Sequence, residues 1–397
     1  MTSSVYIAKT VYGGDGLGRL GDGRVVFVRG AFAGESVKAD IFEEKRNFVR
    51  ARLVEVVEPS QHRTGTGPEP IPGMVYANLT QKGEEIAKED QLREFLERNR
   101  FDPSLLRPGP ASAASALNYR NKVVYHFARQ GGKWAIGYRV EPGHEILDVA
   151  EDPLARPEIN AKLPEIRKSV LALLTQGADA VRRSVAAKET VTVRWSARSG
   201  VQWWIGDAPA GQAMKEVTCG RVFEVPADGF YQVNPEVGEA LAKSVAAEFA
   251  SAPTEDMIDL YCGVGVFGLC CAPKRLTGIE SGRQAVEYAR RNAAAQGATG
   301  ARFFAEQVGR SLRRIRVSRD ATVVVDPPRG GMEPNVPRWL AGCGAKRIFY
   351  VSCDPATLMR DLKAMRGAYG IESVRWFNMF PRTARFETLV VLRKAGA

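Results

Sequence analysis

Short apolar runs at alternating positions dominate the first 60 residues. Runs such as "VVFV" are separated by glycine-rich turns, and a last run, "NFVRARLVEVV", ends before Pro59. Closely spaced short strands punctuated by turn residues predict a small closed β-barrel. We therefore expect residues 1–60 to form a barrel of the OB-like kind, which often binds oligonucleotides.

Helical periodicity appears after a turn-rich stretch that contains "GTGPEPIPG". In "EEIAKEDQLREFLERN" apolar residues recur at helical spacing with charges between them, which predicts an amphipathic helix near 84–99. Farther along, strand-like runs such as "NKVVYHFAR" and "VQWWIG" surround one helical stretch. We expect residues 61–224 to form an α+β middle domain, with the helix near 84–99 packed on the domain that follows.

Four apolar runs alternate with helical or loop segments in residues 225–397. They are "DMIDLYCG", "RLTGIE", "ATVVVDPP" and "KRIFYVSC". This alternation predicts a parallel sheet covered by helices on both faces, which is a doubly wound, Rossmann-like α/β domain. In such domains ligands bind outside the carboxyl ends of the strands. The chemistry of the protein is therefore sought at those four ends.

Composition supports a multidomain intracellular protein. The chain has 397 residues, of which 45% are hydrophobic and 25% charged, values typical of globular proteins. It contains no apolar run of roughly 18 residues that could span a membrane. Its first residues lack the pattern of a signal peptide. All six cysteines follow position 218, none in a CxxC pair, and there are three histidines. We therefore expect a cytoplasmic protein with no disulfide framework and no metal site.

Basic residues are concentrated at one end of the chain. The formal net charge is +11, and residues 301–397 contain 18 basic and eight acidic side chains, whereas residues 1–60 contain nine and eight. A basic face of this kind attracts polyanions, most often nucleic acid. A solvated basic surface that only maintains solubility explains the charge equally well, so charge alone leaves both interpretations open.

The first strand end carries glycines in G-x-G-x-x-G spacing, at Gly263, Gly265 and Gly268. Glycine allows a tight turn and a close approach of the backbone to a ligand. Glu280 ends the next strand, where a carboxylate can accept hydrogen bonds from ribose hydroxyls. Nicotinamide dinucleotides and S-adenosylmethionine both fit this arrangement. The pattern thus predicts a nucleoside cofactor rather than a simple strand-to-helix turn.

The remaining strand ends supply candidate catalytic groups. Asp326 begins "DPPRGG", a stiff loop whose prolines donate no hydrogen bonds. Cys353 ends an apolar strand just before Asp354 and Pro355, where a thiolate could act as a nucleophile. Glu387 opens the last apolar strand, and it is a candidate general base because no histidine follows position 144. Taken alone, Glu387 also fits a surface glutamate paired with Arg385.

The other cysteines lack such a setting. We expect them to be ordinary core cysteines, the usual fate of an isolated thiol. They are Cys219, Cys270, Cys271 and Cys343.

In combination, "DPPRGG", "IFYVSCDPAT" and "FPRTARFE" resemble the RNA 5-methyluridine (uracil-C5) methyltransferase family. The resemblance extends over almost the whole chain: residues 1–60 resemble the RNA-binding TRAM domain, and "LNYRNKVVYHF" and "FYQVNPEV" match further family segments. It implies a class I enzyme that methylates ribosomal RNA or tRNA with S-adenosylmethionine, with ribosomal RNA slightly favoured. RNA would be the partner, and we expect a monomer.

The resemblance also implies roles for individual residues. Cys353 would be the nucleophile that adds to carbon 6 of uracil, and Glu387 would remove the proton from carbon 5. The residues implied to contact the cofactor are Gln232, Tyr261, Glu280 and Asp326. A target base must leave its stack to reach such a site, and RNA loops present unstacked bases.

Three departures from the family pattern stand out. Residues 1–218 contain no cysteine, so we expect no iron–sulfur cluster of the kind that many relatives hold. Val266 replaces a polar residue of some relatives. The last motif, which contains Glu387, has Asn378, Arg382 and Arg385 where relatives often have Asp and His.

The sequence leaves three alternatives. An RNA cytosine-C5 methyltransferase would use similar thiolate chemistry. An NAD-dependent oxidoreductase would explain the glycine loop but has no use for the barrel or for the loop around Cys353. A catalytically decayed RNA-binding module is hard to reconcile with intact Asp326, Cys353 and Glu387.

Overall fold

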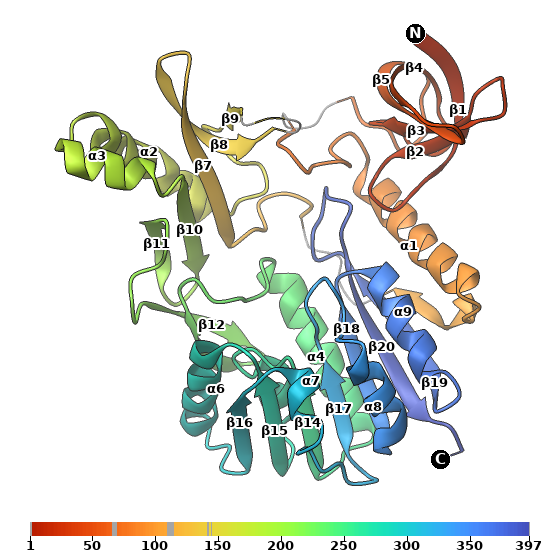
Figure 1. The fold of residues 1–397 in the computed structure, drawn as a ribbon, viewed down its shortest axis with the longest axis vertical. Helices are drawn as coiled ribbons and strands as arrows, with labels where there is room; N and C mark the ends of the chain where they lie inside the picture. The colour runs from red at the N-terminus through yellow and green to blue at the C-terminus, as the bar shows by residue number, and fades with distance from the viewer. Residues whose placement is uncertain (1, 66–69, 109–114, 141–142, 144, 397) are drawn as a thin grey trace. The chain divides into compact units, whose positions relative to one another are not determined.

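The chain forms two compact units in a computed structural model that describes residues 2–65, 70–108, 115–140, 143 and 145–396. Unit 1 contains Met1–Phe101 together with Phe380–Phe386, and unit 2 contains Asp102–Met379 and Glu387–Ala397. The chain therefore passes from unit 2 into unit 1 and back just before Glu387. Figure 1 gives the course of the chain within each unit.

Five strands of unit 1 close into a barrel. They are β1 (Thr2–Thr10), β2 (Gly16–Arg19), β3 (Val25–Arg29), β4 (Ser36–Glu44) and β5 (Phe48–Glu58), in the order β1-β2-β3-β5-β4. The β3–β5 pair is parallel and the others are antiparallel. Gly18 is required where β1 and β2 approach, because a Cβ there would lie 2.5 Å from the carbonyl oxygen of Tyr6. The small β-barrel expected in the amino-terminal part of the chain is confirmed.

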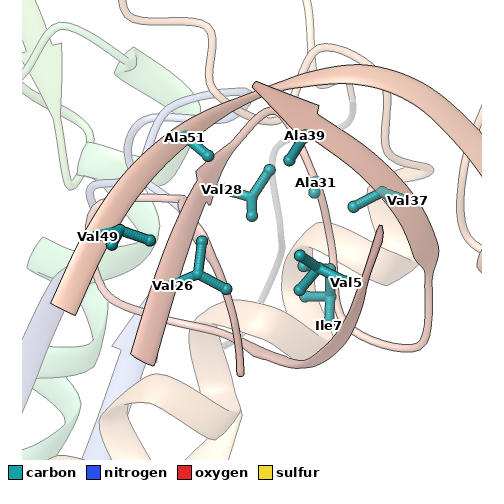
Figure 2. Packing of buried hydrophobic residues seen from close by; sticks show 9 residues of the cluster. All are labelled: Val5, Ile7, Val26, Val28, Ala31, Val37, Ala39, Val49 and Ala51. Atoms are coloured by element: carbon teal, nitrogen blue, oxygen red, sulfur yellow. The ribbon is translucent and has the colours of Figure 1, made fainter. Parts of the chain in front are cut away.

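Small aliphatic side chains fill the barrel. Figure 2 shows nine of them pointing inward from the strands and from the turn that carries Ala31. They alternate along each strand with outward-facing residues, as the period of two requires. The cluster consists of Val5, Ile7, Val26, Val28, Ala31, Val37, Ala39, Val49 and Ala51, each at most 4% exposed.

Helix α1 (Gln81–Arg98) follows the barrel. Its N-cap, Thr80, accepts a hydrogen bond from the amide of Gly83. Glu84 and Lys88 form an ion pair at 2.7 Å although both side chains are fully buried. Two further contacts offset the cost of burying these charges: Lys88 donates to the carbonyl oxygen of Phe380, and Glu84 accepts from the amide of Arg382. The helix thus binds the backbone of Phe380–Phe386. The expected packing of this helix on the catalytic domain stays a prediction.

The amino-terminal half of unit 2 contains a five-stranded antiparallel sheet in the order β11-β10-β7-β8-β9. Its strands are β7 (Lys122–Gln130), β8 (Lys133–Arg139), β9 (Ile146–Asp148), β10 (Thr190–Ser196) and β11 (Gly200–Ile205). Helices α2 (Pro157–Thr175) and α3 (Asp179–Ala186) accompany it, where the sequence predicted one helix. A two-stranded ribbon, β12 (Ala213–Thr218) and β13 (Arg221–Pro226), leads to the next layer.

An eight-stranded sheet in the order β16-β15-β14-β17-β18-β20-β19-β6 forms the rest of unit 2. β14 to β18 are parallel and β20 runs against its neighbours. The strands are β14 (Asp256–Leu260), β15 (Arg275–Glu280), β16 (Ala301–Ala305), β17 (Thr322–Val325), β18 (Arg347–Ser352), β19 (Tyr369–Phe377), β20 (Glu387–Lys394) and β6 (Leu106–Pro108, after a 3₁₀ turn at Pro103–Leu105).

Helices cover both faces of this sheet. The helices are α4 (Pro235–Ser251), α5 (Val266–Cys271), α6 (Arg283–Ala295), α7 (Val308–Ser311), α8 (Asn335–Cys343) and α9 (Pro355–Met365). In Figure 1, α8 and α9 lie in front of the central strands and α4 lies behind them. The four apolar runs noted in the sequence are β14, β15, β17 and β18, so the doubly wound fold is confirmed. Within the described residues, no helix is both long and apolar enough to cross a membrane.

Candidate active site

The loop from β14 to α5 forms the floor of the site. Gly263 and Gly265 adopt φ values of 53° and 88°, and Tyr261 is also in the left-handed region at 63°. At Gly265 a Cβ would lie 3.2 Å from the Phe303 ring, whereas at Gly263 it would point into open space. Glycine is therefore needed at Gly265 for packing, and at Gly263 it leaves room for a ligand. The turn has the geometry that the G-x-G-x-x-G spacing predicted.

Glu280 lies at the carboxyl end of β15, next to this loop. Its Oε2 accepts a hydrogen bond from the amide of Gly263 at 3.3 Å. Its Oε1 accepts from the hydroxyl of Ser281 and the amide of Gly282 at 2.9 and 2.7 Å. These bonds fix the carboxylate beside the glycine loop, where it can meet a ribose.

A pocket that is partly open to solvent lies beside the loop. It brings together three of the residues expected to contact a cofactor, Gln232, Tyr261 and Asp326, while Glu280 reaches it through Gly263. Val264, Val266 and Phe267 of the loop and of α5 contribute apolar surface, with Pro235 and Ala242 of α4. Gln232 packs tightly on α4, since a Cβ added at Gly238 of that helix would lie 2.8 Å from the Cβ of Gln232. An apolar wall with a few fixed polar groups is typical of a nucleoside pocket.

The loop after β17 is held by α9. The amide of Asp326 donates to the carbonyl oxygen of Leu260 at 3.3 Å, which places its carboxyl beside the end of β14. Farther along, Asp361 accepts hydrogen bonds from the amide of Met332 at 3.0 Å and from the Tyr350 hydroxyl at 2.7 Å. Asp361 thus fixes the end of the "DPPRGGM" loop, a role that the sequence did not indicate.

Cys353 and Glu387 occupy adjacent strand ends. Ser352 of β18 pairs with Thr388 of β20 in an antiparallel register, so the residues just beyond this pair are Cys353 and Glu387. Asp354 caps α9 by accepting from the amides of Ala356 and Thr357 at 3.0 Å. The thiol therefore lies at the amino terminus of a helix, whose dipole favours a negative charge.

Carboxyl groups dominate the electrostatics around the thiol. Burial raises the pKa of Cys353 to about 12, with further contributions from Glu387 and Asp326, while Arg329 acts in the opposite direction. Burial likewise raises the pKa of Asp326 to about 8. The pKa of Glu387 is raised well above its ordinary value by burial and by Asp326, again opposed by Arg329. The sequence analysis did not single out Arg329, although it belongs to the "DPPRGG" motif.

Glu387 is buried, with 4% of its surface exposed, so it is not the surface glutamate that Arg385 could have paired with. Its Oε2 has no hydrogen-bond partner among the described residues. A buried carboxyl oxygen without a partner is costly, and such groups cluster at functional sites. This oxygen is available to a proton or to a bound base.

Two further observations concern residues that sequence reasoning missed or misjudged. Phe230 is 74% exposed although it is aromatic and lines the cavity beside Tyr231. The feature of the sequence that could have identified Phe230 is its position two residues before Gln232.

The expectation that Cys219, Cys270, Cys271 and Cys343 are core cysteines is wrong: all four are partly exposed, and Cys262 is the buried one. They lie in turns and at helix ends, where a small apolar residue remains in contact with solvent.

Comparison with known protein families gives two matches. Residues 215–395 match the family described as tRNA (uracil-5-)-methyltransferase, and residues 4–54 match the TRAM domain. The first match covers the β12–β13 ribbon and nearly all of the doubly wound layer. The second covers the barrel of unit 1.

Relatives extend over the full chain. An uncharacterized RNA methyltransferase of Streptomyces avermitilis is 30% identical over 99% of this chain and 98% of its own length. A counterpart from Gloeobacter violaceus is 28% identical over 99% and 97%. Among solved structures, the Pyrococcus abyssi tRNA (uracil-54, C5)-methyltransferase in complex with S-adenosyl-L-homocysteine has the same fold, with a TM-score of 0.74 at 20% identity over 98% of this chain and 100% of that one.

The glycine loop, the "DPPRGG" loop and Cys353 thus lie in the segment that matches the methyltransferase family, and a TRAM barrel precedes that segment in the chain. On this full-length similarity, the chain belongs to the RNA uracil-C5 methyltransferase family, whose enzymes depend on S-adenosylmethionine.

Proposed function

We propose that the protein methylates carbon 5 of a uridine in RNA through a covalent bond between Cys353 and carbon 6 of the base. The observation that carries this proposal is the pairing of Cys353 and Glu387 at adjacent strand ends, with an unpartnered oxygen on Glu387. Carbon 5 of uracil is too weak a nucleophile to take a methyl group directly. A thiol beside a carboxyl supplies both the activating nucleophile and the later base.

The cavity beside the glycine loop fits S-adenosylmethionine. Gly263 leaves open space, the Glu280 carboxylate is fixed beside it, and Val266 and Phe267 offer an apolar surface. In this proposal Glu280 binds the ribose, and Gln232, Tyr261 and Asp326 contact the rest of the cofactor. When bound, the cofactor supplies an electrophilic methyl group and a sulfonium cation, and a cation in this carboxyl-rich pocket favours the ionised forms of Asp326 and Glu387.

The thiol of Cys353 must lose its proton before it reacts. Its raised pKa means that it is neutral in the resting protein. Arg329 and the amino terminus of α9 favour the thiolate, and a neighbouring carboxylate can accept the proton. The thiolate then adds to carbon 6, which leaves an enolate that is nucleophilic at carbon 5.

Glu387 completes the reaction. After the methyl group has bonded to carbon 5, that carbon still carries its original hydrogen, which must leave as a proton. The ionised Glu387 accepts this proton, the electrons of the C–H bond reform the ring double bond, and the bond between sulfur and carbon 6 breaks. Burial that raises the pKa of a carboxyl also makes its ionised form a stronger base.

The substrate is a base displaced from its stack. A thiolate adds to carbon 6 from above or below the plane of the ring, so the base must present one face to Cys353. The exposed Phe230 at the cavity provides a surface on which a base can stack. The TRAM barrel of unit 1 would bind the surrounding RNA. We place ribosomal RNA ahead of tRNA as substrate, although the matching family and the Pyrococcus protein carry tRNA in their names. We expect the protein to act as a monomer in the cytoplasm.

The test is methyl transfer from labelled S-adenosylmethionine to unmodified ribosomal RNA and tRNA transcripts, followed by nucleoside analysis. Wild type and Cys353→Ala are compared. Label in 5-methyluridine that is lost in the variant supports the proposal and identifies the RNA class. Label in 5-methylcytidine would instead indicate a cytosine methyltransferase, and label that persists in the variant would exclude the covalent route.

A further inference from the structure

The segment that joins the β12–β13 ribbon to α4 is held by the five-stranded antiparallel sheet. This segment, residues 226–233, brings Phe230 and Gln232 to the wall of the cavity. Six of its backbone carbonyl oxygens accept hydrogen bonds from Arg194 of β10, from Lys122 at the start of β7 and from Asn121 just before it. The sheet therefore fixes the course of the segment by its backbone.

Arg194 makes most of these bonds. Its side chain is buried, with 1% of the residue exposed, although it belongs to an apolar strand. Nη1 donates to the carbonyl oxygens of residues 226, 227 and 229, at 3.1, 3.0 and 3.1 Å. Nη2 donates to Oε1 of Glu216 at 3.1 Å, and Glu216 lines the cavity. A planar guanidinium with several donors can hold such a set of acceptors, whereas an ammonium group cannot.

Lys122 and Asn121 hold the rest of the segment. Nζ of Lys122 donates to the carbonyl oxygen of Asp228 at 2.9 Å. Asn121 is 1% exposed, and its backbone amide donates to the carbonyl oxygen of Val233 at 2.9 Å. Nδ2 of Asn121 donates to the carbonyl oxygen of Gln232 at 3.3 Å. Both ends of the segment are thus fixed, and Phe230 lies between them.

The ring of Phe230 extends from this fixed backbone into solvent, with 74% of the residue exposed. The next residue, Tyr231, is also held, because its hydroxyl is hydrogen-bonded to the hydroxyl of Thr218. An aromatic side chain on a fixed backbone loses little conformational freedom when a base stacks on it. More of the stacking energy then appears as affinity for the base.

We propose that Arg194 is a positioning residue for RNA binding, which together with Lys122 and Asn121 fixes residues 226–233 and so holds Phe230 ready to stack on an unstacked uracil. Arg194 acts through the backbone of the segment and does not touch the RNA. The inference rests on the proposed function, because that function makes uracil the ligand. It gives a role to the antiparallel sheet, which lies outside the residues that match the methyltransferase family.

The first measurement is hydrogen–deuterium exchange of the full-length Cys353→Ala protein, with and without Arg194→Lys. Lysine keeps a cation beside Glu216 but replaces the guanidinium by a single donor group, so the fold should persist. Peptides that cover residues 226–233 should exchange faster in the variant, whereas peptides from β14 and β18 should be unchanged. Lys122→Met should act in the same direction, and it provides the test if Arg194→Lys does not fold.

The second measurement is the affinity for fluorescently labelled decauridylate, a single strand of uridines, in the same Cys353→Ala background. Phe230→Ala should weaken binding roughly tenfold through the loss of stacking, and Arg194→Lys should weaken it roughly threefold. The protein with both changes should bind as Phe230→Ala does, because Arg194 acts only through the ring. A general structural defect would instead weaken binding equally in both backgrounds.

Arg139→Met is the matched control, since Arg139 belongs to the same sheet but forms an exposed ion pair with Glu189. It should change neither the exchange of residues 226–233 nor the affinity. Unchanged exchange of this segment in Arg194→Lys would overturn the proposal. So would unchanged binding in Phe230→Ala, or an effect of Arg194→Lys that persists without the Phe230 ring. Neither measurement involves the Cys353 thiol, so a failure of the covalent methylation route would appear only in the methyl-transfer assay.

Discussion

Cys353 and Cys219 are both partly exposed thiols of unit 2, yet their surroundings change their acidity in opposite directions. Burial and the carboxyls of Glu387 and Asp326 raise the pKa of Cys353 to about 12. A neighbouring thiol and two cations lower the pKa of Cys219. The thiol assigned to catalysis is thus the less reactive one in the resting protein. The difference teaches that a nucleophile can be kept neutral until cofactor and substrate are in place.

The largest expected effect separates the two thiols by function. Cys353→Ala should lower methyl transfer by on the order of a thousandfold or more, because no other group can add to carbon 6. Cys219→Ser under reducing conditions should stay within about twofold of wild type. Both are measured as label incorporated into RNA under single-turnover conditions. Equal losses of methyl transfer in the two variants would contradict the assignment of catalysis to Cys353 alone.

Glu387→Gln should slow turnover by roughly a hundredfold or more, since general-base catalysis typically contributes this much. The glutamine cannot take the carbon 5 proton, so the methylated adduct should accumulate and appear as an RNA–protein band on a denaturing gel. Glu372→Gln, a surface change beside Arg347, serves as the control. Full turnover in the Glu387 variant would assign the base to another residue.

Alkylation compares the two thiols directly. With iodoacetamide near neutral pH, Cys219 should react at least about tenfold faster than Cys353, because the thiolate is the reacting form. Glu387→Gln should reduce the difference between the two alkylation rates, since the Glu387 charge is one cause of the raised pKa of Cys353. Mass spectrometry of time points gives both rates. A faster Cys353 in the wild type would contradict the electrostatics described above.

The smallest expected effect is on stability. The pKa of Asp326 is raised from 3.8 to about 8, mainly by burial, so the folded protein holds a proton that the unfolded chain releases within that window. The stability that this proton gives is present at low pH and is lost as pH rises toward 8. Asp326→Asn should therefore reduce the fall in Tm between about pH 5 and pH 8 by a few degrees. The exposed Asp320→Asn is the control, and equal slopes would contradict the prediction.

Strand ends were the part of the site that the sequence predicted well. Apolar runs followed by glycine, proline or a lone polar residue mark buried parallel strands and the loops after them. Gly263, Asp326 and Cys353 could therefore be assigned to one edge of the sheet from the amino-acid pattern alone. The barrel could be predicted equally well from the sequence, because its alternating apolar residues and its turns are local features.

What escaped prediction depends on contacts between distant parts of the chain. Lys88 belongs to the charged positions of an amphipathic pattern, yet it is fully buried because Glu84 and a backbone carbonyl satisfy its charge. Glu387 could not be distinguished from a surface residue, since nothing local records its burial.

The passage of Phe380–Phe386 through unit 1 has a consequence for how such proteins can change during evolution. Arg382 is held by Glu84 of α1, and Phe386 is buried immediately before Glu387. A gene rearrangement that deleted or exchanged residues 1–101 would strip this seven-residue excursion of its partners, directly beside the strand that begins with Glu387. The barrel and its helix are therefore not an independently exchangeable module. They are inherited together with the carboxyl-terminal loop, because Glu84 of the helix binds the backbone amide of Arg382 in that loop.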